Sequence, residues 1–481
     1  MNPRAVLRVL GVVVAAVGVA MLPSAVFALV DGTRDLVPFL ISAGVSLAAG
    51  FGLVAGTRGR VDLGVRDGFA IVSFGWLGCA VFGAMPFFLS GVCPNPVDAL
   101  FESMSGFTTT GATIFEDIEA LPRGILFWRS MTHWLGGMGI VVLSVAVLPA
   151  LGVGGMQLFR AEVPGPSADR LSPRIQNTAK ILWGVYVGLS AAEAILLTVG
   201  GMNWFDSLCH TFGTMATGGF STKNASIGHY DSAYIHAVVT VFMFLAGANF
   251  SLHYWLLKRR FTHYARDEEF RFYVIVAAAA TAILWLNLVL RMGEAPLHGL
   301  QLASFQAVSI LTTTGYGTAD FLLWGFGAQV LLFLLMFFGG CAGSTGGSMK
   351  HMRILLLGKH ALRELRRLLH RQAVFNVKFN GTRVQDETMT NVLGFFLLFM
   401  LVFAACTLAL AAMGLDLETS AGAAAATLGN IGPGLGEVGP ASTYTDLPHA
   451  AKVLLSFCMM LGRLELFTVL VLLMPMFWRR A

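Results

Sequence analysis

Four short glycine-containing turns constrain the fold of this chain more than any other feature. Each turn follows an apolar segment too short to cross a bilayer and precedes one long enough to do so. Non-helical backbone at membrane depth is tolerated only where it is buried in protein or lines a watery cavity. Four such turns meeting on one axis would satisfy that condition by forming a pore. The turns are Thr109-Thr110-Gly111, Ala216-Thr217-Gly218, Thr313-Thr314-Gly315 and Thr427-Leu428-Gly429.

The composition is that of a membrane protein. The chain is 56% hydrophobic and 12% charged over 481 residues, with a mean hydropathy of +0.71. A soluble protein of this size would carry about twice that charged fraction. The apolar runs mostly reach the ~20 residues that a spanning helix needs, and no alternating strand pattern accompanies them. The sequence therefore predicts an all-α polytopic membrane protein.

The charge distribution predicts the orientation of this protein. Most of its 32 Lys and Arg residues fall in one set of alternating loops, with the densest run between Lys350 and Arg383. The other set of loops is rich in Asp and Glu. The positive-inside rule places the basic loops and both termini in the cytoplasm, so all four turns face the outside. Because orientation explains the basic charge, we expect membrane lipid and no nucleic acid as a partner.

The order of apolar segments predicts a helical hairpin followed by four repeated units. Each unit holds a spanning helix, a short re-entrant helix, a turn and a second spanning helix. Ten spanning and four half-length helices are expected, arranged with pseudo-symmetry around a central ion pore. The predicted segments are 1–67 for the hairpin and 68–160, 161–260, 261–371 and 372–481 for the four pore units.

The turns themselves have the chemistry of a cation filter. The short helices would direct their partially negative C-terminal ends at the cavity, which favours a cation. Glycine reaches backbone angles that let carbonyl groups point inward at little cost. The stretch 313–317 (Thr-Thr-Gly-Tyr-Gly) differs at one position from the T-V-G-Y-G run of potassium-channel filters. The alternative is that each turn simply joins two helices. The predicted ring of carbonyl carriers is Gly111, Gly218, Gly315 and Gly429.

These features together resemble the TrkH-type subunits of the Trk/Ktr/HKT superfamily of potassium uptake proteins. The resemblance covers the N-terminal hairpin, the four units and the segment 157–166 (Gln-Leu-Phe-Arg-Ala-Glu-Val-Pro-Gly-Pro). It implies a bacterial inner-membrane protein with K⁺ as the transported ion, a homodimer, and a cytosolic TrkA-type regulatory ring that binds nucleotide. It also implies a filter shorter than in potassium channels, so we expect weaker discrimination against Na⁺.

A glycine-rich interruption in the third unit is the predicted gate. Residues 339–347 contain five glycines in nine positions, which cannot propagate a good helix. A packing kink is the simpler interpretation. The family resemblance instead implies a mobile intramembrane loop beneath the filter. The predicted gating residues of this loop are Gly343, Ser344, Thr345, Gly346 and Gly347.

Arg463 is the predicted partner of that loop. It lies near the middle of the last spanning segment, where a cation costs at least ~2.5–3.5 kcal/mol and normally has a specific partner. Glu465 is only two residues away and so does not share its helix face. We therefore expect exposed carbonyl groups of 339–347 to bind Arg463 and hold the gate closed. Lys452, earlier in the same segment, is expected to extend to the outer interface.

Other sequence patterns give weaker indications of function. The stretch 434–439 matches G-x-G-x-x-G, but no strand precedes it, so no nucleotide is expected to bind this chain. No paired catalytic groups occur at membrane depth, which argues against an enzyme. An Na⁺- or H⁺-coupled cation symporter on the same fold remains the alternative to a channel-like uptake pathway.

Overall fold

The computed structural model describes residues 1–57, 64–139, 175–370, 373 and 375–479. Within these ranges the protein is helical apart from a two-stranded hairpin of β1 (Lys378–Phe379) and β2 (Thr382–Arg383). Six helices or helix pairs are long and apolar enough to cross a membrane, and two sharply bent pairs also qualify in length and composition. The expected all-α polytopic membrane fold is confirmed. The finer division into five segments stays a prediction, and the segment 157–166 lies outside the described residues.

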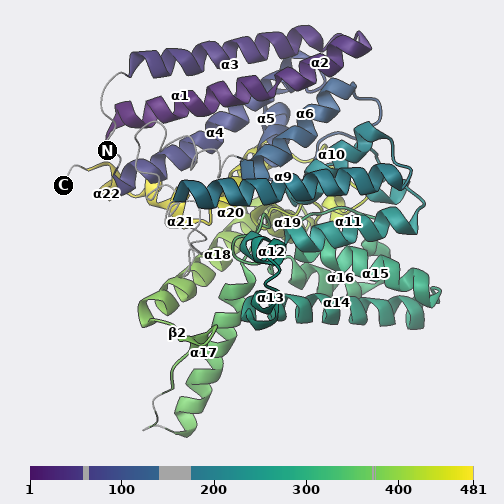
Figure 1. Ribbon diagram of the computed structural model, residues 1–481, viewed down its shortest axis with the longest axis vertical. Coiled ribbons are helices and arrows are strands. Elements are labelled where there is room, and N and C mark those ends of the chain that lie inside the picture. Colours follow the sequence, from purple (N-terminus) through teal and green to yellow (C-terminus); the bar gives the residue numbers. More distant parts are fainter. Residues whose placement is uncertain (58–63, 140–174, 371–372, 374, 480–481) are drawn as a thin grey trace.

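The N-terminal hairpin packs along one edge of the molecule (Figure 1). Its two arms approach closely at a pair of glycines, because a Cβ atom on Gly11 would lie only 2.7 Å from the carbonyl oxygen of Gly50. The start of the chain lies on the same side as its last described residues. The backbone N–H of Asn2 donates to Asp67 (2.6 Å), and the neighbouring Arg66 donates to the carbonyl of Arg479 (2.9 Å). The hairpin consists of α1 (Pro3–Ala20), α2 (Leu22–Asp31) and α3 (Leu36–Gly56).

The rest of the chain repeats one pattern of a long helix, a short helix and a further helical segment. The long helices are α4 (Val65–Leu89), α9 (Ile175–Val199), α14 (Glu268–Met292) and α18 (Asp386–Ala412). The short helices are α5 (Pro96–Phe107), α10 (Trp204–Met215), α15 (Pro296–Leu311) and α19 (Leu417–Leu428). The segments that follow them are α6 (Arg123–Trp134) with η1 (Leu135–Gly139), α11 (Ala233–Ala246) with α12 (Phe250–Leu257), α16 (Phe326–Leu335) with α17 (His351–Leu369), and α20 (His449–Arg463) with α21 (Phe467–Leu470).

Smaller elements connect these helices. They are the 3₁₀ turns η2 (Ser226–His229), η3 (Phe321–Trp324), η4 (Gly436–Val438) and η5 (Val471–Leu473), and the short helices α13 (Thr262–Arg266) and α22 (Pro475–Trp478).

Local sequence explains where the short helices begin. Asn95, Asn203 and Asp416 each accept a hydrogen bond from a backbone N–H group in the first turn of α5, α10 and α19. These side chains satisfy donors that a helix start leaves unpaired. The third short helix has no such cap and instead begins with Pro296, which suits a first helical position.

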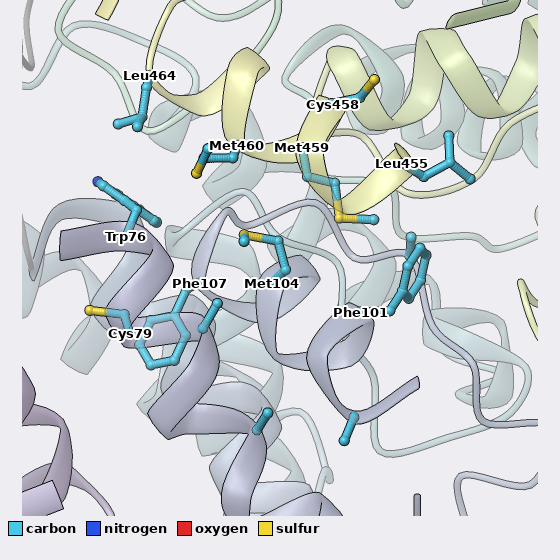
Figure 2. Packing of buried hydrophobic residues seen from close by; sticks show 14 of the residues in the cluster. Trp76, Cys79, Phe101, Met104, Phe107, Leu455, Cys458, Met459, Met460 and Leu464 are labelled. Atoms are coloured by element: carbon cyan, nitrogen blue, oxygen red, sulfur yellow. The ribbon is translucent and has the colours of Figure 1, made fainter. Parts of the chain in front are cut away.

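A large apolar core fixes the first and fourth repeats against each other. Figure 2 shows Met104 of α5 facing Met459 and Met460 of α20, with Phe101 and Phe107 on either side. Methionine adapts its shape to irregular gaps, which suits a contact between a short helix and a bent one. This packing anchors the short helix α5 at a fixed depth in the molecule.

Candidate ion pathway

The four short helices end in turns with the same backbone conformation. One residue after each C-cap, a non-glycine residue has a positive φ: Thr109 (53°), Thr217 (52°), Thr313 (62°) and Asn430 (54°). Two residues further on stands a glycine with a positive φ: Gly111 (81°), Gly219 (82°), Gly315 (79°) and Gly432 (95°). A left-handed conformation is rare for a β-branched residue such as threonine. Strain of this kind concentrates at functional sites.

The hydrogen bonds of the turns repeat as well. The backbone N–H after each positive-φ residue donates to a carbonyl five residues earlier, which is the pattern that ends many helices. These bonds run from Thr110 to Ser105 (2.9 Å), from Gly218 to Gly213 (2.7 Å), from Thr314 to Ser309 (2.9 Å) and from Ile431 to Ala426 (2.8 Å). The four segments are therefore equivalent residue by residue.

The four turns close into a ring. A Cβ atom added to Gly111 would collide with the carbonyl oxygen of Gly218 in the second turn. One on Gly219 would meet the carbonyl of Thr314, and one on Gly315 would meet that of Ile431. One on Gly432 would meet the carbonyl of Thr110, which returns to the first turn. Each glycine is thus in close contact with the carbonyl of the residue that precedes the equivalent glycine in the next turn.

All four of these glycines line one cavity of about 180 Å³. Within the described part of the chain, two successive carbonyl groups of each turn accept no hydrogen bond. Because buried carbonyls are nearly always paired, such a set is unusual. A dehydrated cation binds to oxygen atoms of this kind. The unpaired carbonyls belong to Thr109 and Thr110, Thr217 and Gly218, Thr313 and Thr314, and Asn430 and Ile431.

The register differs from the sequence prediction in two of the four turns. Thr109-Thr110-Gly111 and Thr313-Thr314-Gly315 occupy equivalent places, as predicted. In the second turn the positive-φ glycine is Gly219, one residue beyond the predicted Gly218, and Ala216 is the C-cap of α10. The fourth turn is shifted by three residues. Thr427 and Leu428 are the last residues of α19, Gly429 is its C-cap, and Gly432 holds the place of Gly111.

A residue spacing shared by all four turns could identify these glycines from the sequence. A threonine or asparagine stands two residues before the glycine in every turn. Asparagine tolerates the left-handed conformation better than other residues that carry a side chain. Asn430 also donates to the Thr110 hydroxyl (3.0 Å) and to the carbonyl of Met459 (2.8 Å), so it links the fourth turn to the first.

Buried polar contacts support the turns from behind. Arg129 forms an ion pair with Glu102 (2.8 Å), and both side chains are almost completely buried. Arg129 also donates to the carbonyl of Ser221 just beyond the second turn (3.1 Å). Lys452 forms a second pair with Asp98 (2.8 Å) and is 2% exposed. The expectation that Lys452 extends to the outer interface is therefore wrong, because the lysine is buried and the half-buried carboxylate of Asp98 holds it in place.

Beneath the turns, the helical segment after each turn is interrupted. The first contains the π-helical stretch η1, and the second bends by 104° between α11 and α12. The third has no helix from 336 to 350, and the fourth bends by 112° after α20. Glu465 and Leu466 have positive φ at that last bend. Only the third interruption is predicted from the sequence.

The loop of residues 339–347 fills the space beneath the ring. Gly347 donates to the Thr313 hydroxyl (2.7 Å), and a Cβ atom on Gly347 would collide with the carbonyl of Gly429. Thr345 donates to the carbonyl of Met215 at the end of α10 (3.0 Å). The loop therefore touches the ends of the second, third and fourth short helices. Gly343 within it has φ 74°, Ser344 bonds back to Cys341, and the carbonyl of Gly346 accepts from Lys350.

Arg463 connects three of the four interruptions. Its guanidinium group donates to the carbonyl of Thr345 (2.7 Å) in the loop and to those of Gly136 (2.6 Å) and Gly137 (2.7 Å) in η1. Arg463 itself is the last residue of α20, where the fourth segment bends. Helix interruptions leave carbonyl groups without their usual donors, and a buried cation needs such oxygens. Among the described residues, the predicted loop thus supplies one carbonyl group to Arg463, and η1 supplies two.

Two carboxylates hold the flanks of the loop. Glu269 is 4% exposed and accepts hydrogen bonds from the backbone N–H groups of Ala342 (2.7 Å) and Met352 (2.9 Å). Glu465 forms an ion pair with Arg353 in the first turn of α17. The second interruption contributes as well, because the carbonyl of Gly247 accepts from Cys341 (2.8 Å).

A ring of unpaired carbonyls at the ends of four short helices, in a polytopic helical protein, is the arrangement expected of a cation transport protein. Comparison with known proteins identifies the family. The family model TrkH, described as a cation transport protein, matches residues 39–480. The chain therefore belongs to the TrkH family of cation transport proteins, and the resemblance stated from the sequence is confirmed.

Individual relatives extend over the whole chain. The Trk system potassium uptake protein TrkH of Halomonas elongata is 44% identical, with 100% of each chain covered. The protein TrkG of the Escherichia coli Trk system is 38% identical, with 99% of each chain covered. The crystal structure of the potassium transporter TrkH from Vibrio parahaemolyticus superimposes with a TM-score of 0.90 at 40% identity, covering 100% of both chains.

Proposed function

We propose that this protein takes up K⁺ through the ring of four turns, which acts as its selectivity filter. The proposal is supported above all by the unpaired carbonyl groups of four equivalent turns around one cavity. The C-terminal ends of the four short helices surround the same place and add partial negative charge. Relatives at about this level of identity are named as potassium uptake proteins.

The loop of residues 339–347 is the gate in this proposal. It lies directly under the filter, and Arg463 ties it to the first and fourth interruptions. A loop that fills the pathway must move for ions to pass. Its hydrogen bonds to Met215, Gly247 and Thr313 would have to break together with those of Arg463.

Family membership supports further parts of the proposal. The protein acts in the bacterial inner membrane as a homodimer, with both termini in the cytoplasm. A cytosolic TrkA-type ring that binds nucleotide regulates it, and this chain binds no nucleotide itself. The start and end of the chain lie together on one side, as this orientation requires.

Flux into proteoliposomes tests the transport proposal. Wild-type protein is expected to take up Rb⁺ faster than Na⁺, and Gly315→Ser is expected to lose that preference because the new side chain collides with the carbonyl of Ile431. Uptake that follows an imposed membrane potential without an ion gradient of Na⁺ or H⁺ supports a channel-like pathway. If wild type and Gly315→Ser have the same ratio of Rb⁺ to Na⁺ uptake, this result would contradict a role of the ring as the filter.

A further inference from the structure

A second cavity, of about 910 Å³, borders the loop of residues 339–347 at Ala342 and includes no residue of the four turns. It is open to the surface and is lined by α12, α13, the start of α14, α17 and the segment 379–388 that includes β2. In Figure 1, α12, α13 and α14 lie at the centre and lower edge of the helical body, and α17 and β2 project below it. The volume is within the range of ~300–1,000 Å³ typical of small-molecule sites.

Some charged side chains that line this cavity are bound by other protein groups, and others are not. Asp267 caps α14 by accepting from the N–H of Phe270 (2.7 Å) and also accepts from Asn380 (3.0 Å). Glu269 is occupied by the two backbone N–H groups of the loop region. The exposed side chains of Arg266 and Arg383 also line the cavity, and neither guanidinium group has an ion pair or hydrogen bond with the described residues. The side chains free to donate hydrogen bonds to a ligand are therefore the two guanidinium groups, while both carboxylates already accept from protein donors.

The chemistry of the lining narrows the ligand further. Two guanidinium groups with unused donors are suited to phosphate oxygens, which arginine binds through paired N–H groups. Trp255 and His263 line the same cavity and stack on each other, with ring centroids 4.8 Å apart. They present an apolar wall beside the cations. A ligand with a phosphate group and an organic body matches both features.

We propose that this cavity binds a phosphate-bearing ligand, held by Arg266 and Arg383, and that the bound ligand stabilises the closed gate. The cavity and the gate share their wall. Asn249, Glu269 and Ala342 line the cavity, and a Cβ atom on Gly343 would lie 3.0 Å from the Asn249 side chain. Phe250, the residue after Asn249, donates its N–H to the carbonyl of Gly343 (3.0 Å). A ligand that fits this arrangement favours the state in which these contacts exist.

Binding to the full-length protein in detergent tests the site directly. Inorganic pyrophosphate is the soluble probe, and phosphatidylglycerol retained in native mass spectra is the lipid probe. The double variant Arg266→Gln/Arg383→Gln is expected to lose about tenfold or more in affinity, since hydrogen bonds to charged groups are strong. The matched control is Arg367→Gln, an exposed arginine of α17 outside the cavity, which should bind like the wild type.

The two probes distinguish the source of the phosphate group. Pyrophosphate binding alone supports a soluble ligand, and phosphatidylglycerol retention alone supports a lipid headgroup. The proposal is overturned if neither probe binds, or if the double variant binds as tightly as Arg367→Gln. Equal gel-filtration profiles and unfolding temperatures for both variants show that they are folded.

Coupling to the gate is measured as Rb⁺ flux in liposomes, and this part rests on the proposed transport function. With the probe that binds, wild-type flux is expected to fall severalfold, while flux through the double variant stays unchanged. Binding without an effect on flux would overturn the coupling. Binding without measurable flux under any condition would instead contradict the transport function and support the site.

Discussion

The four turns have the same backbone structure, whereas the four helix interruptions beneath them all differ in structure. Above, four turns share one backbone conformation, one hydrogen bond and one glycine contact, repeated around the axis. Below, the four interruptions are a π-helix, a bend of 104°, a long loop and a bend of 112°. One arginine, Arg463, joins three of them.

The difference follows from what each ring has to do. A dehydrated ion needs oxygen atoms on all sides at similar distances, so equivalent turns suit a binding site. A gate needs one element with two arrangements, and it is enough that a single loop moves. The four turns are equivalent only in their backbone, because their supporting side chains differ. The ion pair of Glu102 and Arg129 supports the contact between the first and second turns.

The largest effect is expected at that ion pair. Glu102→Gln leaves the guanidinium of Arg129 buried without its carboxylate, which typically lowers the free energy of unfolding by about 3–5 kcal/mol. The double variant Glu102→Gln/Arg129→Met removes both charges and is expected to be more stable than the single one. Thermal unfolding in detergent measures both. A single variant as stable as the wild type would show that the upper ring does not depend on this asymmetric support.

The equivalence of the turns is tested at Gly432 and Gly429. Gly432→Ala forces a side chain into a left-handed conformation and against the carbonyl of Thr110, and Rb⁺ flux is expected to fall about a hundredfold. Gly429→Ala is the comparison variant: its backbone is right-handed and Ala216 occupies the equivalent C-cap in the second unit, but a Cβ atom there would lie 2.8 Å from the carbonyl of Ala425, so a smaller loss of flux is expected. Greater damage from Gly429→Ala would contradict the register described here.

The smallest of the three effects is expected at the gate. Arg463→Ala removes the hydrogen bonds that tie Thr345 to η1, and Rb⁺ flux without a regulator is expected to rise about tenfold, which corresponds to ~1.4 kcal/mol. Arg463→Lys keeps the charge but cannot reach three carbonyl groups at once, so an intermediate flux is expected. Unchanged flux in the alanine variant would count against a closed loop held by Arg463.

Much of the fold could be predicted because membrane insertion depends on simple patterns. The long apolar runs and the start of each short helix follow from hydropathy and capping residues such as Asn95 and Asp416. The interruption at 339–347 was predictable because glycine weakens helices. These features are local, so neighbouring residues determine them.

The parts that could not be predicted depend on contacts between distant segments. Leu466 is a good helix former with φ 54°, so nothing local indicates a bend there. Lys452 looks like an interfacial lysine until Asp98 is placed beside it. In two turns the glycine with positive φ is Gly219 or Gly432, whereas the sequence pattern pointed to the nearby Gly218 and Gly429. Equivalence of backbone angles resolves that choice, and a sequence pattern of three letters does not.

The position of the Arg463 guanidinium in one quarter of the molecule has a consequence for how such a protein can be built. In a channel assembled from four identical polypeptides, any residue at this depth would occur once per subunit. Four positive charges would then surround the axis and repel the cation that the carbonyls attract. Encoding all quarters in one gene product avoids this, since a latch can be placed in a single quadrant while the conduction site keeps its rotational regularity.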